Sequence, residues 1–422
     1  MASKTDTRDL VPVHGGLAEP VDRSVSLRDR KEFLTGVEGL PRAQVRRADL
    51  STVYRFGDGA LSPLEGPMGE VAWRRVLDEA VVIADGKPYA WGIPLSLPVT
   101  DAEAEALSPG GSVALENEAG EIVAVVEGLE VFEWDKAAYV KGVYGTERTD
   151  HPGGAQATDD ERTKLLGGSI RTLPQRFPEA YSQYMLSPRM TRAFIRDRKW
   201  ERALAFQTRN PLHRAHEYAL VAGAERVTGE GHFTGVVLNP LVGELKGDDV
   251  PAATRMRCYE TLHDLELLGE GDLDESLWAK AGWGLAEVFE LLGLDIKMFY
   301  GGPREAIMHA VYRQNYGFSD LVIGRKHADA PYFDGSPIWG DFDAQEIFDN
   351  LAGELHIQPC KIGFAAFYES LGRVDLTENH ADEKPYGISG TKVREQLKGG
   401  ERPDARIMRP EVADILIDAY KD

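Results

Sequence analysis

The chain has 422 residues, of which 42% are hydrophobic and 28% charged, so its length predicts two or three globular domains with a full core. The formal net charge of −21 argues against binding to nucleic acid or to an anionic membrane, since both depend on a cationic surface. No run of 18 apolar residues is present and the N-terminus is polar, so neither a membrane span nor a secretory signal is expected.

The first part of the chain predicts a mostly β domain over residues 1–165. Residues 1 to about 25 are expected to be extended and loosely held. From about residue 26, short apolar runs are broken by turn residues, and several runs alternate with period two, which favours a small barrel with helical insertions. Residues 151–164, HPGGAQATDDERTK, are rich in Gly and Asp and are predicted to be a linker.

From about residue 166 to 354, strand-like runs alternate with helical patterns. The strand-like runs are RALAFQ (202–207), FTGVVLNPLVG (233–243), IKMFYGG (296–302) and DLVIGR (320–325). This alternation predicts a parallel sheet with helices on both faces, and ligands of such sheets bind beyond the carboxyl ends of the strands.

Residues 355–422 are predicted to form a small C-terminal α/β domain. They contain a strand-like run, CKIGFAAFY (360–368), the turn GISGT (387–391) and two short helical patterns. The two cysteines, Cys258 and Cys360, are too few for a disulfide framework, and we expect buried reduced thiols in a cytoplasmic protein.

The run QTRNPLHRAH (207–216) is the strongest candidate for a functional site. It leaves a predicted strand and enters a predicted helix, with Pro211 suited to the first helical turn. His213 and His216 are three residues apart and should stack on one face of that turn. Free backbone N–H groups and the helix dipole favour an anion there, and the Arg209 guanidinium suits a tetrahedral oxyanion. For one His or Arg alone, a cap or a salt bridge remains an alternative.

Three further polar clusters follow strands or precede helices. Each has an ordinary structural alternative to a functional role. For Lys246 it is a solvated loop lysine, for the cluster at 324–331 a charged surface loop, and for the cluster at 388–397 plain helix capping. The clusters are Lys246 in NPLVGELKGDDV (239–250), Gly324, Arg325, Lys326 and His327 in GRKHADAP (324–331), and Ser389 or Thr391 in ISGTKVREQL (388–397).

These clusters predict several cationic, N–H-rich loops on one rim of a parallel sheet. Neither a GxxxxGK[ST] nor a GxGxxG pattern occurs, and no Ser-His-Asp or Cys nucleophile arrangement is present. The residues alone therefore indicate nucleotide-phosphate chemistry without a covalent intermediate.

QTRNPLHRAH resembles the QxRNPxHxxH signature of the ATP sulfurylase (sulfate adenylyltransferase) family, within the HxGH-type nucleotidyltransferase superfamily. Other segments resemble family motifs in the same order along nearly the whole chain. They are LVPVHGG (10–16), LSPLEGPMG (61–69), VYGTERTDHPG (143–153), LGGSI (166–170), NPLVGELKGDDV (239–250), GRKHA (324–328), DAQEIF (343–348), GISGTKVREQL (387–397) and RPEVADIL (409–416).

The resemblance implies an α/β protein with a Rossmann-like nucleotidyltransferase domain, an N-terminal β-barrel-like (PUA-like) domain and a small C-terminal α/β domain. It implies the reversible conversion of ATP and sulfate to adenosine 5′-phosphosulfate and pyrophosphate, with Mg²⁺ on the phosphates, and a homo-oligomer. The cysteine cluster that binds zinc in some bacterial members is absent near FAAFYESLGRV (364–374), so we expect no metal site in the protein.

The resemblance also assigns residues to roles. It places sulfate on Gln207, Arg209 and Ala328. The catalytic positions are Thr208, Arg209, Asn210, His213 and His216. The positions that bind the nucleotide are Gln207, Asn210, His213, His216, Gly324, Arg325, Lys326, His327 and Ala366.

The third loop departs from the family pattern GRDHAGxG. Lys326 replaces the acid, Asp329 replaces the glycine, and the insert APYFDGSPIWGDFDAQ follows. Two alternatives to sulfate activation stay open on the sequence. One is a same-fold adenylyltransferase for another oxyanion or a sulfonate, and the other is a catalytically silent regulatory homologue.

Overall fold

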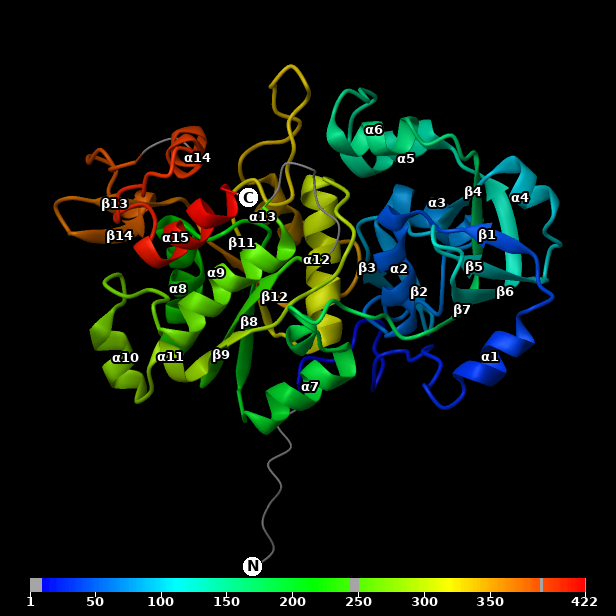
Figure 1. The fold of residues 1–422 in the computed structure, drawn as a ribbon, viewed down its shortest axis with the longest axis horizontal. Helices are drawn as coiled ribbons and strands as arrows, with labels where there is room; N and C mark the ends of the chain where they lie inside the picture. Colours follow the sequence, from blue (N-terminus) through cyan, green and yellow to red (C-terminus); the bar gives the residue numbers. More distant parts are fainter. Residues whose placement is uncertain (1–9, 243–249, 388–389, 422) are drawn as a thin grey trace, which may run out of the picture.

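A computed structural model describes residues 10–242, 250–387 and 390–421 of the chain. The molecule has two lobes with one larger β-sheet in each, and helix α12 (Gly302–Tyr316) lies between them (Figure 1). The C-terminal elements pack against the second lobe, on the side far from the first (Figure 1).

The sheet of the first lobe has the strand order β1-β5-β6-β7-β4. Strands β1 and β5 are parallel, and the other neighbours are antiparallel. The predicted β domain with helical insertions is confirmed. The strands are β1 Arg42–Gln44, β4 Leu97–Val99, β5 Ser112–Glu116, β6 Ile122–Glu133 and β7 Lys164–Thr172, with a separate hairpin of β2 Val81–Ala84 and β3 Lys87–Ala90. The helices are α1 Arg30–Gly36, α2 Arg47–Gly57, α3 Glu70–Glu79, α4 Asp101–Glu105, α5 Lys136–Tyr144 and α6 Pro152–Thr158.

The predicted linker over 151–164 is wrong. Helix α6 occupies most of this segment, and the His151 side chain caps it by accepting a hydrogen bond from the backbone N–H of Gly154. Arg162 is buried and pairs with Asp49 and Asp160. The Gly and Asp residues that suggested a linker therefore serve a tightly packed helix and a buried ion pair. Strand β7 then continues the first sheet through residues 166–170, past the predicted domain boundary at 165.

The described part of the N-terminal segment is also packed more firmly than predicted. Val13 and His14 are fully buried. The His14 ring hydrogen-bonds the carbonyl oxygen of Ala90, and its backbone N–H donates to Asn315 of α12. The expectation of a loose segment is therefore wrong for residues 10–25, while residues 1–9 lie outside the described residues.

The second lobe is a five-stranded sheet in the order β10-β9-β8-β11-β12, and every neighbouring pair is parallel, as predicted. The strands are β8 Arg202–Thr208, β9 Thr234–Pro240, β10 Phe289–Leu291, β11 Asp320–Ile323 and β12 Gln358–Lys361. The helices and short 3₁₀ turns are η1 Ser182–Tyr184, α7 Pro188–Asp197, α8 Arg214–Gly229, α9 Ala252–Asp264, α10 Glu275–Ala281, α11 Leu285–Val288, α12, α13 Asp343–Glu346 and η2 Ile347–Asn350.

Two predicted strands differ from the structure. Residues 296–302 form no strand, because the backbone N–H groups of Phe299 and Gly301 donate to the Glu305 carboxylate instead of to a neighbouring strand. The strand predicted over 360–368 is divided in two: β12 joins the parallel sheet, and β13 (Ala365–Tyr368) pairs with β14 (Arg373–Leu376). The parallel sheet thus extends past residue 354, the predicted end of the middle domain.

Helix α12 is buried nearly all round, as expected for a helix enclosed on every side. Its apolar side chains share one core cluster with both sheets. After β14 come η3 Thr377–Asn379, α14 Gly390–Lys398 and α15 Pro410–Ala419, and α15 packs on α9. Cys258 and Cys360 are buried free thiols, as expected. Within residues 10–242, 250–387 and 390–421, none of the helices could span a bilayer.

Candidate active site

The loop that carries the sequence signature leaves the carboxyl end of β8. Gln207 and Thr208 are the last two residues of β8. The Thr208 hydroxyl donates to the carbonyl oxygen of Asn210 and accepts from its N–H, at 3.0 and 3.3 Å. The Tyr259 hydroxyl donates to the same carbonyl oxygen at 2.9 Å. Thr208 and Tyr259 therefore fix the shape of the loop that presents Arg209.

Helix α8 begins at Arg214, three residues later than predicted, so Pro211 lies in the loop before it. His213 is the N-cap residue, and its ring stacks on the ring of His216 with centroids 3.9 Å apart, as the spacing predicted. Burial lowers the pKa of both side chains, and the neighbouring His216 further lowers that of His213, to about 3. Both imidazoles are therefore neutral at neutral pH.

The C-terminal segment covers part of the α8 N-terminus. The backbone N–H of Arg214 donates to the carbonyl oxygen of Ile407 at 2.9 Å, so it is not available to an anion. Below it, the buried carboxylate of Glu217 pairs with Arg409 at 2.8 Å. The prediction that all the first-turn N–H groups form an anion site is thus too broad, because the N–H of Arg214 is already bonded within the protein.

Arg209 contacts the segment 296–302, which the sequence predicted as a strand and not as part of the site. Its Nη1 donates to the Tyr300 hydroxyl at 3.4 Å, and the guanidinium lies 5.5 Å from the centre of the Tyr300 ring. Tyr300 has a left-handed backbone with φ 54°, which is uncommon for a bulky residue. The adjacent amides are held by Glu305, at 2.9 Å each.

The third loop, Gly324–Ala328, follows β11 and turns inward at His327. The His327 Nε2 lies 2.9 Å from Nδ1 of His309 on α12, and the His309 Nε2 lies 3.4 Å from the amide nitrogen of Gln207. Burial lowers the pKa of His327 to about 3 and lowers that of His309 strongly. The structure thus links Gln207 and His327, which are 120 residues apart in the chain, through one buried imidazole.

The predicted positive charge of this loop is partly offset by one carboxylate. Arg325 and Lys326 both pair with Asp341, at 2.7 and 3.4 Å, and the Lys326 side chain is 43% exposed. His327 is neutral for the reason given above. Arg325 and Lys326 share one carboxylate, so the positive charge expected of this loop is reduced but not removed. The partly exposed, ion-paired Lys326 fits the alternative of a charged surface loop.

The insert after the third loop is anchored to the first lobe. The Tyr332 hydroxyl donates to Thr146 at 2.8 Å, and the Arg148 guanidinium lies 3.7 Å from the centre of the Tyr332 ring. The N–H of Phe333 donates to the carbonyl oxygen of Asp150 at 2.8 Å. These contacts connect the two lobes beside the third loop.

The remaining predicted residues are placed less closely. Ala328 accepts a hydrogen bond from the N–H of Gly302 at 3.2 Å, beside the Tyr300 segment. A side chain at Gly324 would meet open space, which leaves room for a ligand. Ala366 lies on β13, which packs on α8, and within the described chain no hydrogen bond joins it to the residues above. Lys246 and Ser389 lie outside the described residues, and Thr391 is in α14.

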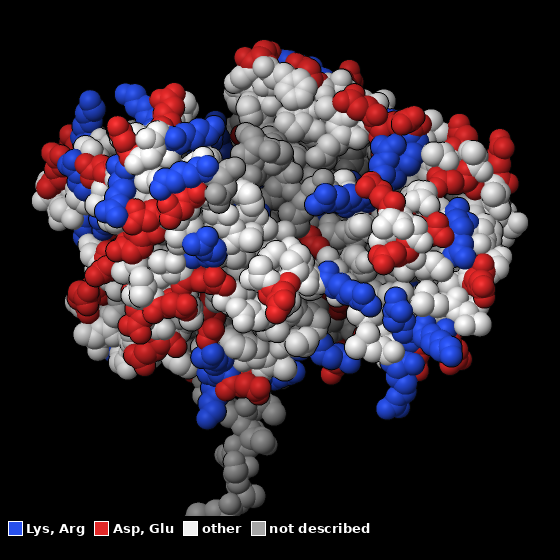
Figure 2. Space-filling model, viewed as in Figure 1, with Lys and Arg blue, Asp and Glu red and all other residues white. Residues whose placement is uncertain are grey.

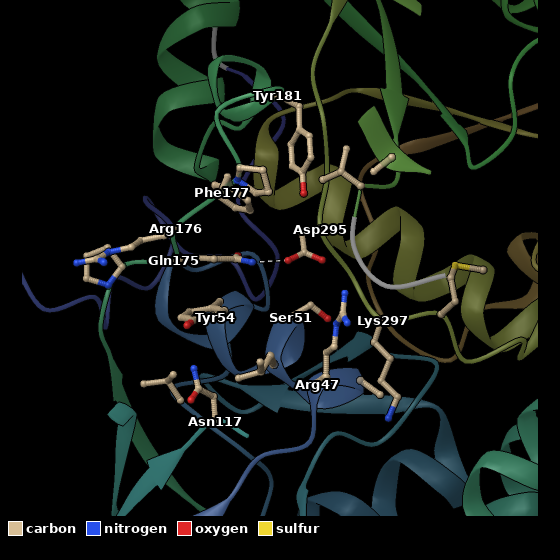
Figure 3. Close-up of a pocket in the computed structure, with 18 of the residues that line it drawn as sticks. Arg47, Ser51, Tyr54, Asn117, Gln175, Arg176, Phe177, Tyr181, Asp295 and Lys297 are labelled. Atoms are coloured by element: carbon tan, nitrogen blue, oxygen red, sulfur yellow. Dashed lines mark hydrogen bonds between the residues drawn. The ribbon is translucent and has the colours of Figure 1, made fainter. Parts of the chain in front are cut away.

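A cleft of about 1350 Å³ opens between the two lobes (Figure 3). Tyr300 lines it, whereas no predicted site residue within the described ranges does, so the cleft borders the candidate site through Tyr300. Acidic side chains gather over the left-hand lobe in Figure 2, and basic ones stand beside the central hollow. The charged residues that line the cleft are Arg30, Arg47, Glu121, Arg176, Arg255, Asp295 and Lys297.

Sequence reasoning missed Tyr300, Glu305 and His309. One signal was available: Glu305 and His309 are polar and one turn apart, and the three residues between them, Ala306–Met308, are apolar. Both side chains are 1% exposed, and such buried polar groups carry more information than buried apolar ones.

Comparison with known proteins matches both lobes. A model of the ATP-sulfurylase family matches residues 182–419, and a model of PUA-like domains matches residues 11–175. A sulfate adenylyltransferase from Pyropia yezoensis is 51% identical over 412 residues, which cover 97% of each chain. One from Symbiobacterium thermophilum is 37% identical over 411 residues, covering 97% of this chain and 96% of that one.

A solved structure gives an independent view of the fold. It is a hexameric APS kinase from Thiobacillus denitrificans, with a TM-score of 0.69 over 96% of this chain and 68% of that chain. The identity is 20%, so this likeness concerns the fold alone. The family models and the relatives cover nearly all of the sequence. This chain belongs to the ATP-sulfurylase family.

Proposed function

We propose that the protein transfers the adenylyl group of ATP to sulfate, forming adenosine 5′-phosphosulfate and pyrophosphate in a reversible reaction. An oxygen of sulfate attacks the α-phosphorus directly, the bond from the α-phosphorus to the β-phosphate oxygen breaks, and pyrophosphate leaves. The observation that carries this proposal is the intact QTRNPLHRAH loop at the carboxyl end of β8, with Arg209 and the stacked His213 and His216 around it.

The residue types suit this reaction without a general base, because sulfate is already an oxyanion. Catalysis then depends on alignment of the two substrates and on stabilisation of negative charge. We assign sulfate to Gln207, Arg209 and Ala328, and the triphosphate to His213 and His216. Thr208 and Asn210 hold the loop through the hydrogen bonds between them.

Mg²⁺ enters this proposal as part of the MgATP substrate. Among the residues that the structure describes, no group of three or more His, Cys, Asp or Glu side chains could hold a metal ion. The backbone and side-chain donors of the site would bind the phosphate oxygens, and Mg²⁺ would neutralise part of the phosphate charge when it is bound there.

Two further properties belong to the proposal. The family resemblance supports a homo-oligomer. The two buried free thiols, Cys258 and Cys360, suit a reducing compartment, so we propose a cytoplasmic location.

An acceptor screen tests the substrate assignment. The purified protein is given MgATP with sulfate, with a different tetrahedral oxyanion such as phosphate, or with an organic sulfonate, and pyrophosphate is measured. Release with sulfate above the anion-free control supports the proposal. Release with a sulfonate alone would favour the same-fold adenylyltransferase, and ATP binding without release under any condition would favour a silent homologue.

A further inference from the structure

Helix α12 carries two buried polar side chains that contact three separate segments of the candidate site. Glu305 and His309 are one helical turn apart, and both are 1% exposed. Neither belongs to the QTRNPLHRAH loop or to the third loop. Burial of a carboxyl and an imidazole at this depth costs free energy unless their hydrogen bonds are made, so their partners indicate what the pair is for.

Glu305 fixes the segment that contacts Arg209. Its Oε1 accepts from the N–H of Phe299 and its Oε2 accepts from the N–H of Gly301, both at 2.9 Å. Tyr300, between them, is held in a left-handed conformation that is uncommon for a bulky residue. The Tyr300 hydroxyl in turn accepts from Arg209. The carboxylate thus sets the position of the aromatic side chain against which the guanidinium rests.

His309 connects the other two segments. Its Nδ1 lies 2.9 Å from Nε2 of His327. Its Nε2 lies 3.4 Å from the Glu305 carboxylate and 3.4 Å from the amide nitrogen of Gln207. Burial raises the pKa of Glu305 to about 7, so above that pH the carboxylate is ionised and only accepts hydrogen bonds. In that state the ring proton of His309 belongs on Nε2. Nδ1 is then the acceptor for an N–H of His327.

This tautomer determines which end of the Gln207 amide should face the ring. With the proton on Nε2, the His309 ring offers a donor, so it should meet the amide oxygen of Gln207. The structure instead has the amide nitrogen there, and the amide oxygen is buried without a hydrogen-bond partner. A half-turn of the amide about its last side-chain bond lets the amide oxygen of Gln207 accept from the His309 ring N–H. The two amide N–H donors then point to the place that the oxygen occupied.

We propose that Glu305 and His309 are positioning residues for adenylyl transfer. His309 holds the Gln207 amide with its N–H donors turned towards the anionic acceptor, and Glu305 holds Tyr300 and, through it, Arg209. This inference rests on the proposed function. Its chemical logic is that an oxyanion is stabilised by N–H donors and repelled by a carbonyl oxygen, in a protein whose net charge of −21 already opposes anions.

A double-mutant cycle on kcat/KM for sulfate, measured above the Glu305 pKa of about 7 so that its carboxylate is ionised, tests whether His309 acts through Gln207. The variants are Gln207→Ala, His309→Phe and the double variant, with melting temperature measured for each. We expect each single variant to lose about tenfold or more in kcat/KM, and the double variant to be about as active as Gln207→Ala alone. A double variant whose loss is the product of the two single losses would overturn the inference, because His309 would then act independently of Gln207.

Two further variants separate positioning from structure. His309→Gln retains an amide donor near the position of Nε2, so it should keep kcat/KM within about threefold of the wild type. A loss as large as that of Gln207→Ala would overturn the inference, even if His309→Phe fails to fold. His14→Phe is the matched control. His14, like His309, is a buried histidine, but its ring bonds the backbone carbonyl of Ala90 and not the site. Any loss of kcat/KM that it causes should therefore multiply with the loss caused by Gln207→Ala.

The wild type also separates this inference from the proposed function. If it releases no pyrophosphate with sulfate, the proposed function fails and the inference fails with it. If it does so and the cycle is multiplicative, only the inference fails.

Discussion

The imidazole rings of His213 and His216 stack at the start of helix α8, with centroids 3.9 Å apart and ring planes 20° from parallel. Burial lowers the pKa of both side chains. The two rings therefore offer neutral N–H donors in the free protein, and two stacked rings cannot both become cations at low cost.

A bound triphosphate should change this charge state. Its negative charge favours the protonated form of an adjacent imidazole, so we predict that MgATP binding takes up less than one proton near pH 7 and is tighter at lower pH. Calorimetric titration in two buffers with different ionisation enthalpies measures the uptake. The double variant His213→Asn/His216→Asn should lose this proton uptake. Equal proton uptake by that variant would contradict the placement of the triphosphate on these rings.

Arg209 is placed to meet the acceptor and the reacting phosphate. Removal of a donor that stabilises charge in a transition state typically costs about 100- to 1000-fold in kcat, and we predict a loss of at least this size for Arg209→Ala. Steady-state pyrophosphate release measures it. Arg189→Ala is the control, because Arg189 is 56% exposed and pairs with Glu19 on the surface, and it should be near wild type. Near-normal activity of Arg209→Ala would remove this residue from the site.

The sequence predicted the parts of the site that are local. The strand RALAFQ and the His213–His216 spacing are set by periodicity, so β8 and the ring stacking could be predicted from neighbouring residues. Pro211 was a weaker guide, because the helix starts only at Arg214, where Ile407 from a distant segment accepts the first N–H.

The parts that depend on distant contacts could not be predicted in the same way. Residues 296–302 have the composition of a strand, but Glu305 takes the amide hydrogens that a strand would donate to a neighbour. His309 links Gln207 to His327 only because α12 lies between the two sheets. No local pattern reports such a contact. The charge of the third loop was overestimated for a similar reason, since Asp341, which pairs with both Arg325 and Lys326, lies 15 residues beyond Lys326.

The Lys326–Asp341 pair leads to a prediction about the residue that departs from the family pattern. The lysine side chain is 43% exposed, and exposed ion pairs contribute about 0–1 kcal/mol. We therefore expect Lys326→Gln to change KM for ATP and for sulfate by less than about threefold at low and at physiological salt. Initial-rate kinetics at both salt concentrations check this, and a larger KM that depends on salt would show that Lys326 meets a substrate anion.

Glu305 should give the protein a specific pH dependence of stability. Burial raises its pKa from 4.5 to about 7, although the Phe299 and Gly301 amides oppose the rise. Between pH 4.5 and about pH 7 the folded protein keeps a proton on Glu305 that the unfolded chain releases. The free energy of unfolding therefore falls by roughly 3 kcal/mol as the pH rises through this range.

Glu305→Gln has no proton to lose in this window. The free energy of unfolding of the wild type minus that of Glu305→Gln, measured by chemical denaturation, should therefore decrease from pH 5 to pH 8. A difference that stays constant over that range would show that the carboxyl group titrates alike in both states of the chain.

Sulfate-dependent release of pyrophosphate is the most direct test of the central claim. The purified chain is incubated with ATP and Mg²⁺, with and without sulfate, and with sulfate but without Mg²⁺. We predict release only when ATP, Mg²⁺ and sulfate are all present, with one adenosine 5′-phosphosulfate formed for each pyrophosphate. Pyrophosphate release that does not depend on sulfate, or no release while ATP still binds, would contradict the claim that this protein activates sulfate.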